Sequence, residues 1–487
     1  MINPMNKLFK LFAVGSLLAL AIACSKDDDP FNPGTTPVKP DPKPDEPDKV
    51  EITLPKKELR GAWLATVWEI DYPGVRGESA QKAKYKEILD MYEQIGINAV
   101  FFQVRGMADA YYNSQYEPWS KTITGTAGQD PGYDILKFLV DETHSRGMQF
   151  HAWINPYRIS TGSNGVFPAL DSRIPAEYTK DYKSIRVYNP ALPEVRQRIA
   201  DIVKEIITKY DVDGIHMDDY FYPSLGSGES MNDQEEYKKY GTDFTKIEDF
   251  RRNNISLMIQ KVQQTIIATR PEVIFSIGPQ GNYDNNYNTQ YIDVATCAKN
   301  GWFDVLIPQL YWTGTTFSTR LQWFTANSGK THLMVGYGIY RYESGASSED
   351  FKTSSSFNTC YNLAANNSKV KGCLFYNTSS LKKNNVGITD AIKSAFSKKV
   401  LIPYLGRTAE QKPAAPTNVK VDGNTLTWSG NAAYYAIYKL DVSGKKASLS
   451  GTATTKSFTL PSKGTYYVTA LTKANEESDL SSEAVYK

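Results

Sequence analysis

Cysteine is scarce in this sequence, and the charges nearly cancel. Four cysteines occur among 487 residues, and no CxxC pair or Cys/His cluster indicates zinc, so we expect no metal and no cofactor. Lys and Arg number 55 against 53 Asp and Glu, a formal net charge of +2. Such a chain has no overall field to attract nucleic acid, and we exclude nucleic-acid binding. Whether Cys360 and Cys373 form a disulfide stays open.

One apolar run near the N-terminus is too short to span a bilayer comfortably. It covers residues 11–22, follows two lysines and ends just before Cys24, a pattern that resembles a bacterial lipoprotein signal. We therefore predict that residues 1–24 are a signal peptide and that Cys24 is the lipidated first residue of the mature protein. An ordinary signal peptide that happens to contain a cysteine is the alternative.

The following segment is rich in proline and charge. Residues 25–56 cannot bury a core and are predicted to be an extended, disordered tether. The tether begins with SKDDDP, an acidic run that resembles the export signal of surface lipoproteins. We expect attachment to the outer membrane through the lipid alone, with the protein either facing the periplasm or displayed on the cell surface.

Short apolar segments alternate with amphipathic stretches from Leu59 onward. The candidate strands are residues 59–68, 97–106, 148–158, 212–220, 273–281, 303–312, 332–340 and 370–379. The clearest helical stretches between them are residues 82–96, 133–147, 193–211 and 245–270. This alternation predicts an α/β fold, a (β/α)8 TIM barrel over residues 57–403. A doubly wound open sheet is less favoured, because no glycine-rich phosphate loop follows the first strand.

The composition changes after the barrel. Residues 404–415 read as a linker, and residues 416–487 contain short alternating strands separated by turn residues. This pattern predicts a small all-β sandwich. The segment resembles a fibronectin type III domain, with Trp428 as the core tryptophan. Such modules are spacers or binding adaptors, and no catalytic constellation is visible in this one.

Polar residues recur on the inward-facing side of the predicted strands. In the strand at 212–220, Ile215 and Met217 should face the helices, which turns His216 and Asp218 inward. The same alternation gives an upper lumen with Gln103, Arg105, His151, Trp153, Asn155, Gln280, Gln309 and Tyr311. An interior built only for stability would favour Val, Ile and Leu, so this set indicates a polar binding site at the carboxyl ends of the strands.

Asp218 and Asp219 form a pair of carboxyl groups at this end of the barrel. Hydrolysis of a glycosidic bond needs one protonated and one ionised carboxyl group, and adjacent carboxylates in a pocket cannot both ionise easily. Consecutive residues need not point into the same space, so a second carboxylate from another loop is an alternative. Glu343 is one candidate, and Asp71 and Asp284 are two others.

Five motifs together resemble the glycoside-hydrolase-like family 10 of bacterial lipoproteins and wall proteins. In order, they are RGAWLATVWEIDYPG, FQVRGMADAYYNSQYEPWS, HAWINPYR, NPALPEVRQRI and DGIHMDDYFYP. The resemblance implies a glycosidase-related barrel, and some family members are implicated in cleaving peptidoglycan strands stripped of their stem peptides. The last motif is also similar to the chitinase signature DGxDxDxE, but Tyr220 replaces the acid glutamate and His216 replaces an aspartate.

The leading hypothesis is a lipid-anchored glycoside hydrolase that acts on peptidoglycan or a related N-acetylated polysaccharide. Its predicted catalytic residues are Asp218, Asp219 and Glu343. Its predicted substrate-binding residues are Gln103, Arg105, His151, Trp153, Asn155, Tyr157, Tyr220, Gln309, Tyr311 and Trp312. Two alternatives are a metal-dependent deacetylase with His151, His216 and Asp218 as ligands, and a non-catalytic glycan-binding lipoprotein. The oligomeric state is not predicted.

Overall fold

The computed structural model describes residues 52–487. The predicted signal peptide, the lipidation site Cys24 and all but the last residues of the predicted tether lie outside the described residues. Among the helices of residues 52–487, none combines the length and the apolar character needed to cross a membrane.

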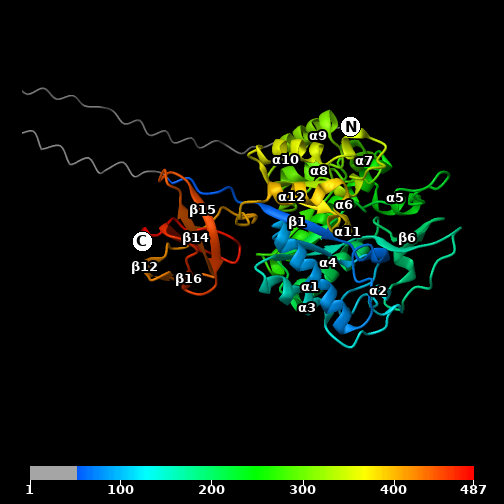
Figure 1. Ribbon diagram of the computed structural model, residues 1–487. Helices are drawn as coiled ribbons and strands as arrows, with labels where there is room; N and C mark the ends of the chain where they lie inside the picture. Colours follow the sequence, from blue (N-terminus) through cyan, green and yellow to red (C-terminus); the bar gives the residue numbers. More distant parts are fainter. Residues whose placement is uncertain (1–51) are drawn as a thin grey trace, which may run out of the picture. The chain divides into compact units, whose positions relative to one another are not determined.

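Eight parallel strands close into a barrel, which confirms the predicted fold (Figure 1). Around the barrel the strands follow the order β1-β11-β10-β9-β8-β7-β3-β2. Their bounds are β1 Leu59–Leu64, β2 Ala99–Arg105, β3 Gln149–Ile154, β7 Gly214–Met217, β8 Ile274–Ile277, β9 Val305–Leu306, β10 His332–Gly338 and β11 Val370–Tyr376. Each falls inside one of the eight apolar segments of the sequence, because a parallel strand buried on both faces is apolar throughout.

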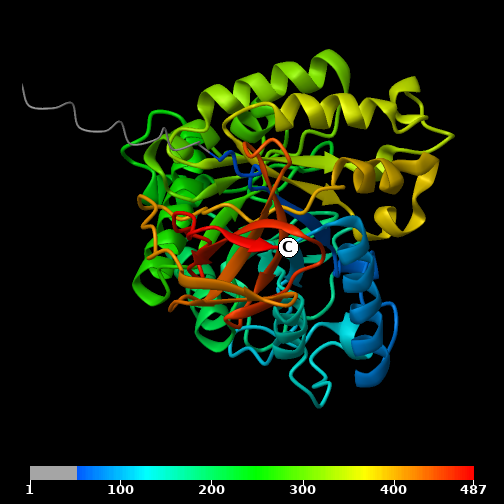
Figure 2. The ribbon, with the colours of Figure 1, turned by 60° about the vertical axis from the view of Figure 1, so that its left-hand side comes forward.

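Helices surround the barrel, as the two views in Figures 1 and 2 show. The longer ones are α1 Glu78–Ile95, α3 Ile135–Ser145, α4 Pro193–Lys209, α6 Ile247–Thr269, α8 Val294–Asn300, α9 Gly314–Asn327, α10 Ser355–Ala365 and α12 Ile388–Ala395. Pro193 occupies the first turn of α4, where its missing N–H costs nothing. The buried stripe of α4, with Val195, Ile199 and Ile206, belongs to the same apolar cluster as Ile215 and Met217 of β7.

Several short elements lie in the loops. They are α2 Lys121–Thr124, α5 Gln234–Tyr240, α7 Tyr283–Asn288 and α11 Thr378–Lys383, with 3-10 turns η1 Val67–Glu69, η2 Ala176–Tyr178, η3 Ile339–Arg341, η4 Glu349–Phe351 and η5 Asn385–Gly387. A three-stranded antiparallel sheet, β4 Arg158–Thr161, β5 Thr179–Asp181 and β6 Ile185–Tyr188, is inserted after β3 in the order β4-β6-β5. The pattern of apolar segments in the sequence does not predict this sheet.

The chain that follows α12 packs against the amino-terminal end of the barrel. Ile402 and Leu405 join the apolar cluster inside the barrel, which includes Phe101 of β2. Arg407 donates to both carboxylate oxygens of Asp304, just before β9, at 2.9 and 2.6 Å. Residues 404–407 of the predicted linker therefore contact the barrel.

The C-terminal region contains two antiparallel sheets. One has the order β12-β13-β16 and the other β15-β14-β17-β18. The bounds are β12 Thr417–Asp422, β13 Thr425–Ser429, β14 Tyr434–Leu440, β15 Ala447–Ala453, β16 Ser457–Thr459, β17 Gly464–Leu471 and β18 Ala484–Tyr486. Trp428 of β13 is buried in a cluster with Tyr435 and Val468, so the predicted core tryptophan is confirmed.

Three cysteines fall within residues 52–487, and each carries a free thiol. Cys297, Cys360 and Cys373 are all buried. Cys360 and Cys373, the pair that the sequence left open, therefore do not form a disulfide.

Candidate active site

The fourth barrel strand in the chain, β7, carries the carboxylate pair. Ile215 and Met217 are fully buried against the helices, whereas His216 points into the barrel and contacts Trp63 of β1. The strand ends at Met217, so Asp218 and Asp219 stand directly at its carboxyl end. This is the end at which (β/α)8 enzymes place their active sites.

Asp218 is almost completely buried, and its two oxygens are held unequally. Its Oδ2 atom accepts a hydrogen bond of 3.0 Å from Trp153 Nε1. Its Oδ1 atom accepts longer bonds of 3.5 Å from Asn155 Nδ2 and 3.4 Å from the Tyr220 N–H. Burial, reinforced by the charge of Asp219, raises the pKa of Asp218 to about 7. The less tightly held Oδ1 is therefore the better position for a proton.

Asp219 is less buried and is surrounded by side-chain amides. Gln309 Nε2 donates to Asp219 Oδ1 at 3.2 Å and to the Gly278 carbonyl at 2.9 Å. Burial raises the pKa of Asp219, while hydrogen bonds from Gln309, Gln280 and Gln290 oppose that rise. The two carboxyl groups titrate as a pair: burial favours a proton on Asp218, and the amide donors around Asp219 favour the negative charge there.

Two histidines lie below the carboxylate pair: His216 is one inward-facing position deeper than Asp218, and His151, paired in register with Gly214, is deeper still. His216 accepts from Trp63 Nε1 at 3.0 Å through Nε2, which assigns the ring proton to Nδ1, 2.9 Å from Ser276 Oγ. His151 stacks on Phe101 with centroids 4.3 Å apart. Burial lowers the pKa of both histidines, to about 4 for His151, so both rings are neutral. Because both nitrogens of His216 have partners, it is not free to bind a metal, and no metal-ligating group of three side chains occurs within residues 52–487.

Two of the predicted substrate-binding residues are engaged by the protein itself. Gln103 Oε1 accepts from the N–H groups of Thr66 and Val67 and so fixes the loop after β1. Arg105 forms a buried two-point ion pair with Glu117, with both N–O distances at 2.6 Å, and also donates to the Asn155 carbonyl. Both residues support the walls of the site.

Tyrosines form a wall on the other side of the opening. Tyr311, Tyr340 and Tyr376 lie with ring centroids 5.8 to 6.2 Å apart, and Trp63 adjoins Tyr376 at 6.3 Å. Tyr340 is about half exposed, so its ring is available to a sugar face. Trp312 lies under the guanidinium of Arg320 at 3.7 Å.

Other predicted residues are placed differently. Tyr157 is buried in the core between barrel and helices, away from solvent. Glu343 is exposed after η3, and its only hydrogen bonds within residues 52–487 involve backbone atoms. Asp284 lies in the first turn of α7 and is also exposed. The structure therefore brings Asp218, Asp219, Trp153, Asn155 and Gln309 into contact, and Glu343 does not contact any of them.

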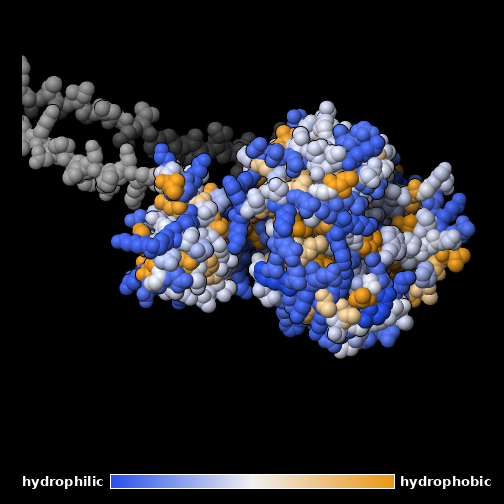
Figure 3. All heavy atoms as spheres, viewed as in Figure 1, coloured by the Kyte–Doolittle hydropathy of each residue, from blue (hydrophilic) through white to orange (hydrophobic). Residues whose placement is uncertain are grey.

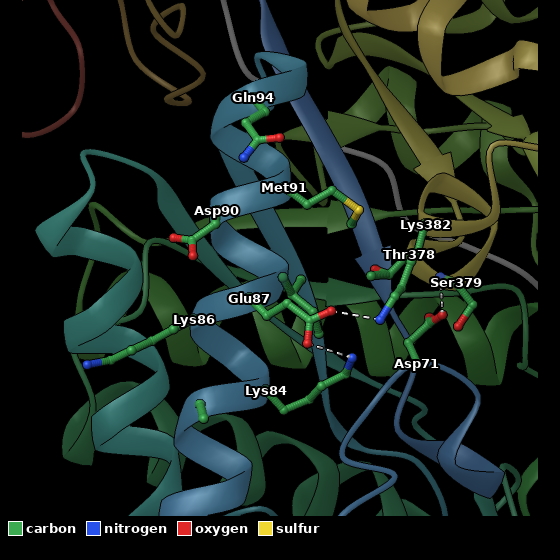
Figure 4. Close-up of a pocket in the computed structure, with 12 residues that line it drawn as sticks. Asp71, Lys84, Lys86, Glu87, Asp90, Met91, Gln94, Thr378, Ser379 and Lys382 are labelled. Atoms are coloured by element: carbon green, nitrogen blue, oxygen red, sulfur yellow. Dashed lines mark hydrogen bonds and ion pairs between the residues drawn. The ribbon is translucent and has the colours of Figure 1, made fainter.

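Asp71 lies in a separate groove on the helical exterior. The groove has a volume of about 710 Å³ and runs between α1 and α11 (Figure 4). Both Asp71 oxygens are engaged, by the N–H groups of Ala65 at 2.8 Å and Ser379 at 2.7 Å, and burial raises its pKa to about 6. Lys382 of α11 pairs with Glu87 of α1 across the opening, and Lys84 pairs with Glu87 along α1. Neither Asp218 nor Asp219 lines this groove.

Arg158, Trp68, Trp63, Tyr376 and Gln290 also belong to the site, although the sequence analysis did not select them. Arg158 and Trp68 were within quoted motifs but lie beyond their strands, where alternation no longer indicates direction. Trp63 looked like an ordinary apolar strand residue. On the face shown in Figure 3, apolar side chains are scattered among hydrophilic ones.

Comparison with known proteins places the chain in a family. Residues 58–358 match the family Glycosyl hydrolase-like 10, and the chain belongs to it. The chain is 34% identical over 481 residues to glycosyl hydrolase YngK of Bacillus subtilis, covering 87% of this chain and 92% of that protein. It is 35% identical over 324 residues to glycosyl hydrolase DigH of Escherichia coli K12, covering 58% of this chain and 73% of that protein. The glycoside hydrolase domain of PgaB from Bordetella bronchiseptica aligns with a TM-score of 0.47 and 10% identity, over 72% of this chain and 100% of that domain.

Proposed function

We propose that this protein is a glycoside hydrolase that cleaves N-acetylated glycan strands, with peptidoglycan stripped of its stem peptides as the leading substrate. The observation that carries the proposal is the buried pair Asp218 and Asp219 at the carboxyl end of β7, with the pKa of Asp218 raised to about 7. The relatives named glycosyl hydrolases support the reaction class.

The two carboxyl groups take different roles. Asp218 donates its Oδ1 proton to the glycosidic oxygen as the bond from that oxygen to the anomeric carbon breaks. The Asp219 carboxylate, held by Gln309, stabilises the positive charge that develops on the sugar ring. Water then adds its hydroxide to the anomeric carbon and returns its proton to the carboxylate pair, which restores the resting state.

The surroundings and the ends of the chain complete the proposal. The tyrosine wall offers ring faces for stacking on sugars. We further propose that Cys24 is lipidated and tethers the barrel to the outer membrane, and that the C-terminal sheets are a fibronectin type III-like adaptor. The three-plus-four strand arrangement supports this last assignment.

The test uses protein lacking residues 1–24, incubated with denuded glycan strands, intact peptidoglycan and chitin oligomers, with products read by mass spectrometry. We expect new reducing ends on denuded strands and a loss of at least about 100-fold in kcat for Asp218→Asn and Asp219→Asn. Asp284→Asn is the matched control, an exposed carboxylate near the same face. Glu343→Gln tests the other predicted acid. Full activity in both pair variants would overturn the proposal.

A non-catalytic glycan-binding role makes a different prediction in the same experiment. Glycan would be retained on the protein without new reducing ends, and the pair variants would change affinity alone. Deacetylated but uncut product would indicate a metal-dependent deacetylase. Both ring nitrogens of His216 already have partners, which weighs against His216 as a metal ligand.

A further inference from the structure

Arg158 stands beside the catalytic pair, between two exposed aromatic rings. It is the first residue of β4 and follows the corner that ends β3. Its guanidinium carbon lies 4.3 Å from the ring centroid of Tyr220 and 5.5 Å from that of Trp68. Tyr220 is 46% exposed and Trp68 is 60% exposed, so solvent reaches both rings. Two exposed rings beside a cation offer a bound molecule both ring faces and a positive charge.

The bonding of Arg158 leaves its charge without a counter-ion. Its Nε donates to the Gly106 carbonyl at 3.2 Å, and its backbone N–H donates to Asn155 Oδ1 at 3.1 Å. Within residues 52–487, no carboxylate forms an ion pair with its guanidinium, although the guanidinium also contacts the Tyr220 hydroxyl. Arg105, which also ends near this opening, is fully neutralised by Glu117. The opening therefore contains one neutralised guanidinium and one, on a residue that is 7% exposed, that has no ion-pair partner within residues 52–487.

The aromatic partner Trp68 is held in an uncommon backbone conformation. Its φ of +52° and ψ of 21° lie in the left-handed region, and Glu69 beside it has a φ of +54°. Such a conformation costs about 1–2 kcal/mol for a residue with a Cβ atom, so the surroundings must fix it. Glu69 forms an ion pair with Arg76 that secures this turn. The stack of Trp68, Arg158 and Tyr220 is thus built into the fold.

A cation available in this way suits one kind of substrate group. A guanidinium binds a carboxylate through two parallel hydrogen bonds, and each charge-assisted bond is stronger than a neutral one. The two flanking rings match the apolar faces of a sugar that carries the carboxylate. Asp218 is near enough for the Arg158 charge to act on it, so a sugar bound here adjoins the reacting bond.

We propose that Arg158 binds the carboxylate of an acidic sugar next to the bond that is cleaved, and so makes the enzyme selective for carboxylate-bearing glycans. This inference rests on the proposed function, because it takes Asp218 and Asp219 as the reacting centre. A lactyl ether on an amino sugar and a uronic acid both supply a carboxylate, and the test separates these two sources.

The first experiment measures binding and needs no turnover. In an Asp219→Asn background, calorimetry compares a denuded peptidoglycan tetrasaccharide with the same tetrasaccharide whose lactyl carboxylates are amidated. We expect Arg158→Gln to weaken binding of the free acid about 10–100-fold, from the loss of about 1.5–3 kcal/mol for charged hydrogen bonds, and to leave the amidated probe unchanged. A hyaluronan tetrasaccharide, whose carboxylates belong to glucuronate, shows whether uronic acids are also accepted.

Two further variants act as controls. Arg186→Gln removes the same charge from the same inserted sheet but from a residue already paired with Asp181, and we expect it to change neither affinity. Arg158→Lys keeps the charge without the two-point geometry and should retain part of the preference. Melting temperatures of all variants report whether the fold is kept.

The second experiment measures hydrolysis with an intact catalytic pair. If Arg158 binds substrate, Arg158→Gln raises KM for the acidic glycan and leaves the amidated one unchanged. If Arg158 only tunes Asp218, the pH profile of kcat shifts for both glycans alike, and the inference is overturned. It is also overturned if neither acidic probe binds better than its neutral counterpart. If binding shows the preference but no glycan is cleaved, the proposed function fails and the carboxylate site stands.

Discussion

At the scale of single residues, the site depends on one proton shared by two neighbouring carboxyl groups. Burial favours the protonated form of Asp218, and the charge of Asp219 adds to that effect. Trp153 opposes both, because its indole N–H donates to the ionised carboxylate. The charge of Arg158 and the Tyr220 N–H oppose them as well, so the working pH range of the enzyme should be set by five identifiable contributions.

We predict a basic limb near pH 7 in the pH dependence of kcat/KM. Asp218 acts in its protonated form, so activity is present below its pKa of about 7 and is lost as the pH rises through that value. Trp153→Phe removes a hydrogen bond that favours the ionised form, which raises the pKa and moves the limb upward by about 1–2 pH units. Initial rates on denuded strands from pH 4 to 9 locate the basic limb of the wild-type protein and of the variant.

The control for this prediction is Trp312→Phe, an indole at the same opening that lies under Arg320 and does not contact Asp218. The basic limb of Trp312→Phe should stay at the wild-type pH. Residual activity in Asp219→Asn should show a limb at lower pH, because a like charge has been removed. If the basic limb of Trp153→Phe stays at the wild-type pH, a group other than Asp218 donates the proton.

At the scale of elements, the ion pair of Arg105 and Glu117 joins four parts of the barrel wall. Arg105 ends β2 and donates to the carbonyl of Asn155 after β3. Glu117 also accepts from Tyr188 of β6 at 3.2 Å, and the Tyr188 hydroxyl accepts from Arg198 of α4 at 3.0 Å. A buried, fully bonded network of this kind fixes the position of the inserted sheet relative to the strands.

We predict that Glu117→Ala lowers the free energy of unfolding by about 3–5 kcal/mol, because it leaves Arg105 buried without a counter-ion. The double variant Arg105→Met with Glu117→Leu removes both charges and should recover most of that loss. Thermal unfolding measures stability, and KM on denuded strands is measured beside it. A double variant with normal stability and a strongly raised KM would show instead that Arg105 binds substrate directly, as the sequence first suggested.

The same elements show what the sequence could predict. Short apolar runs located all eight strands, because a parallel strand is buried on both faces. Alternation of apolar and polar residues then placed His216 and Asp218 inside the barrel. It could not show that Arg105 is neutralised, since Glu117 lies 12 residues later in irregular chain. It also missed β4, β5 and β6, which are three or four residues long and largely polar.

At the scale of the whole molecule, the barrel is completed by chain that lies beyond its last helix. Leu405 enters the apolar interior at the amino-terminal end, and Arg407 neutralises Asp304, a carboxylate with only 4% of its surface exposed. Asp304 also accepts a 2.7 Å hydrogen bond from the Phe275 N–H and so links β8 to β9. A composition change in the sequence thus does not coincide with the end of the packed structure.

We predict that a protein spanning residues 52–412 is more stable than one spanning residues 52–403. The shorter protein loses Arg407 and leaves Asp304 buried without its partner, at an expected cost of about 3–5 kcal/mol. Burial already raises the pKa of Asp304, and loss of Arg407 raises it further, so the folded shorter protein binds a proton more readily than its unfolded chain. The stability of the shorter protein therefore falls as the pH rises from the pKa of Asp304 in the unfolded chain to its higher pKa in the folded protein. The difference in stability between the two proteins should be larger at pH 8 than at pH 5. Scanning calorimetry of both proteins at pH 5 and pH 8 measures this difference. Arg407→Gln in the longer protein is the matched control, because it removes the charge alone. Equal melting temperatures of the two proteins would mean that the barrel is complete by residue 403.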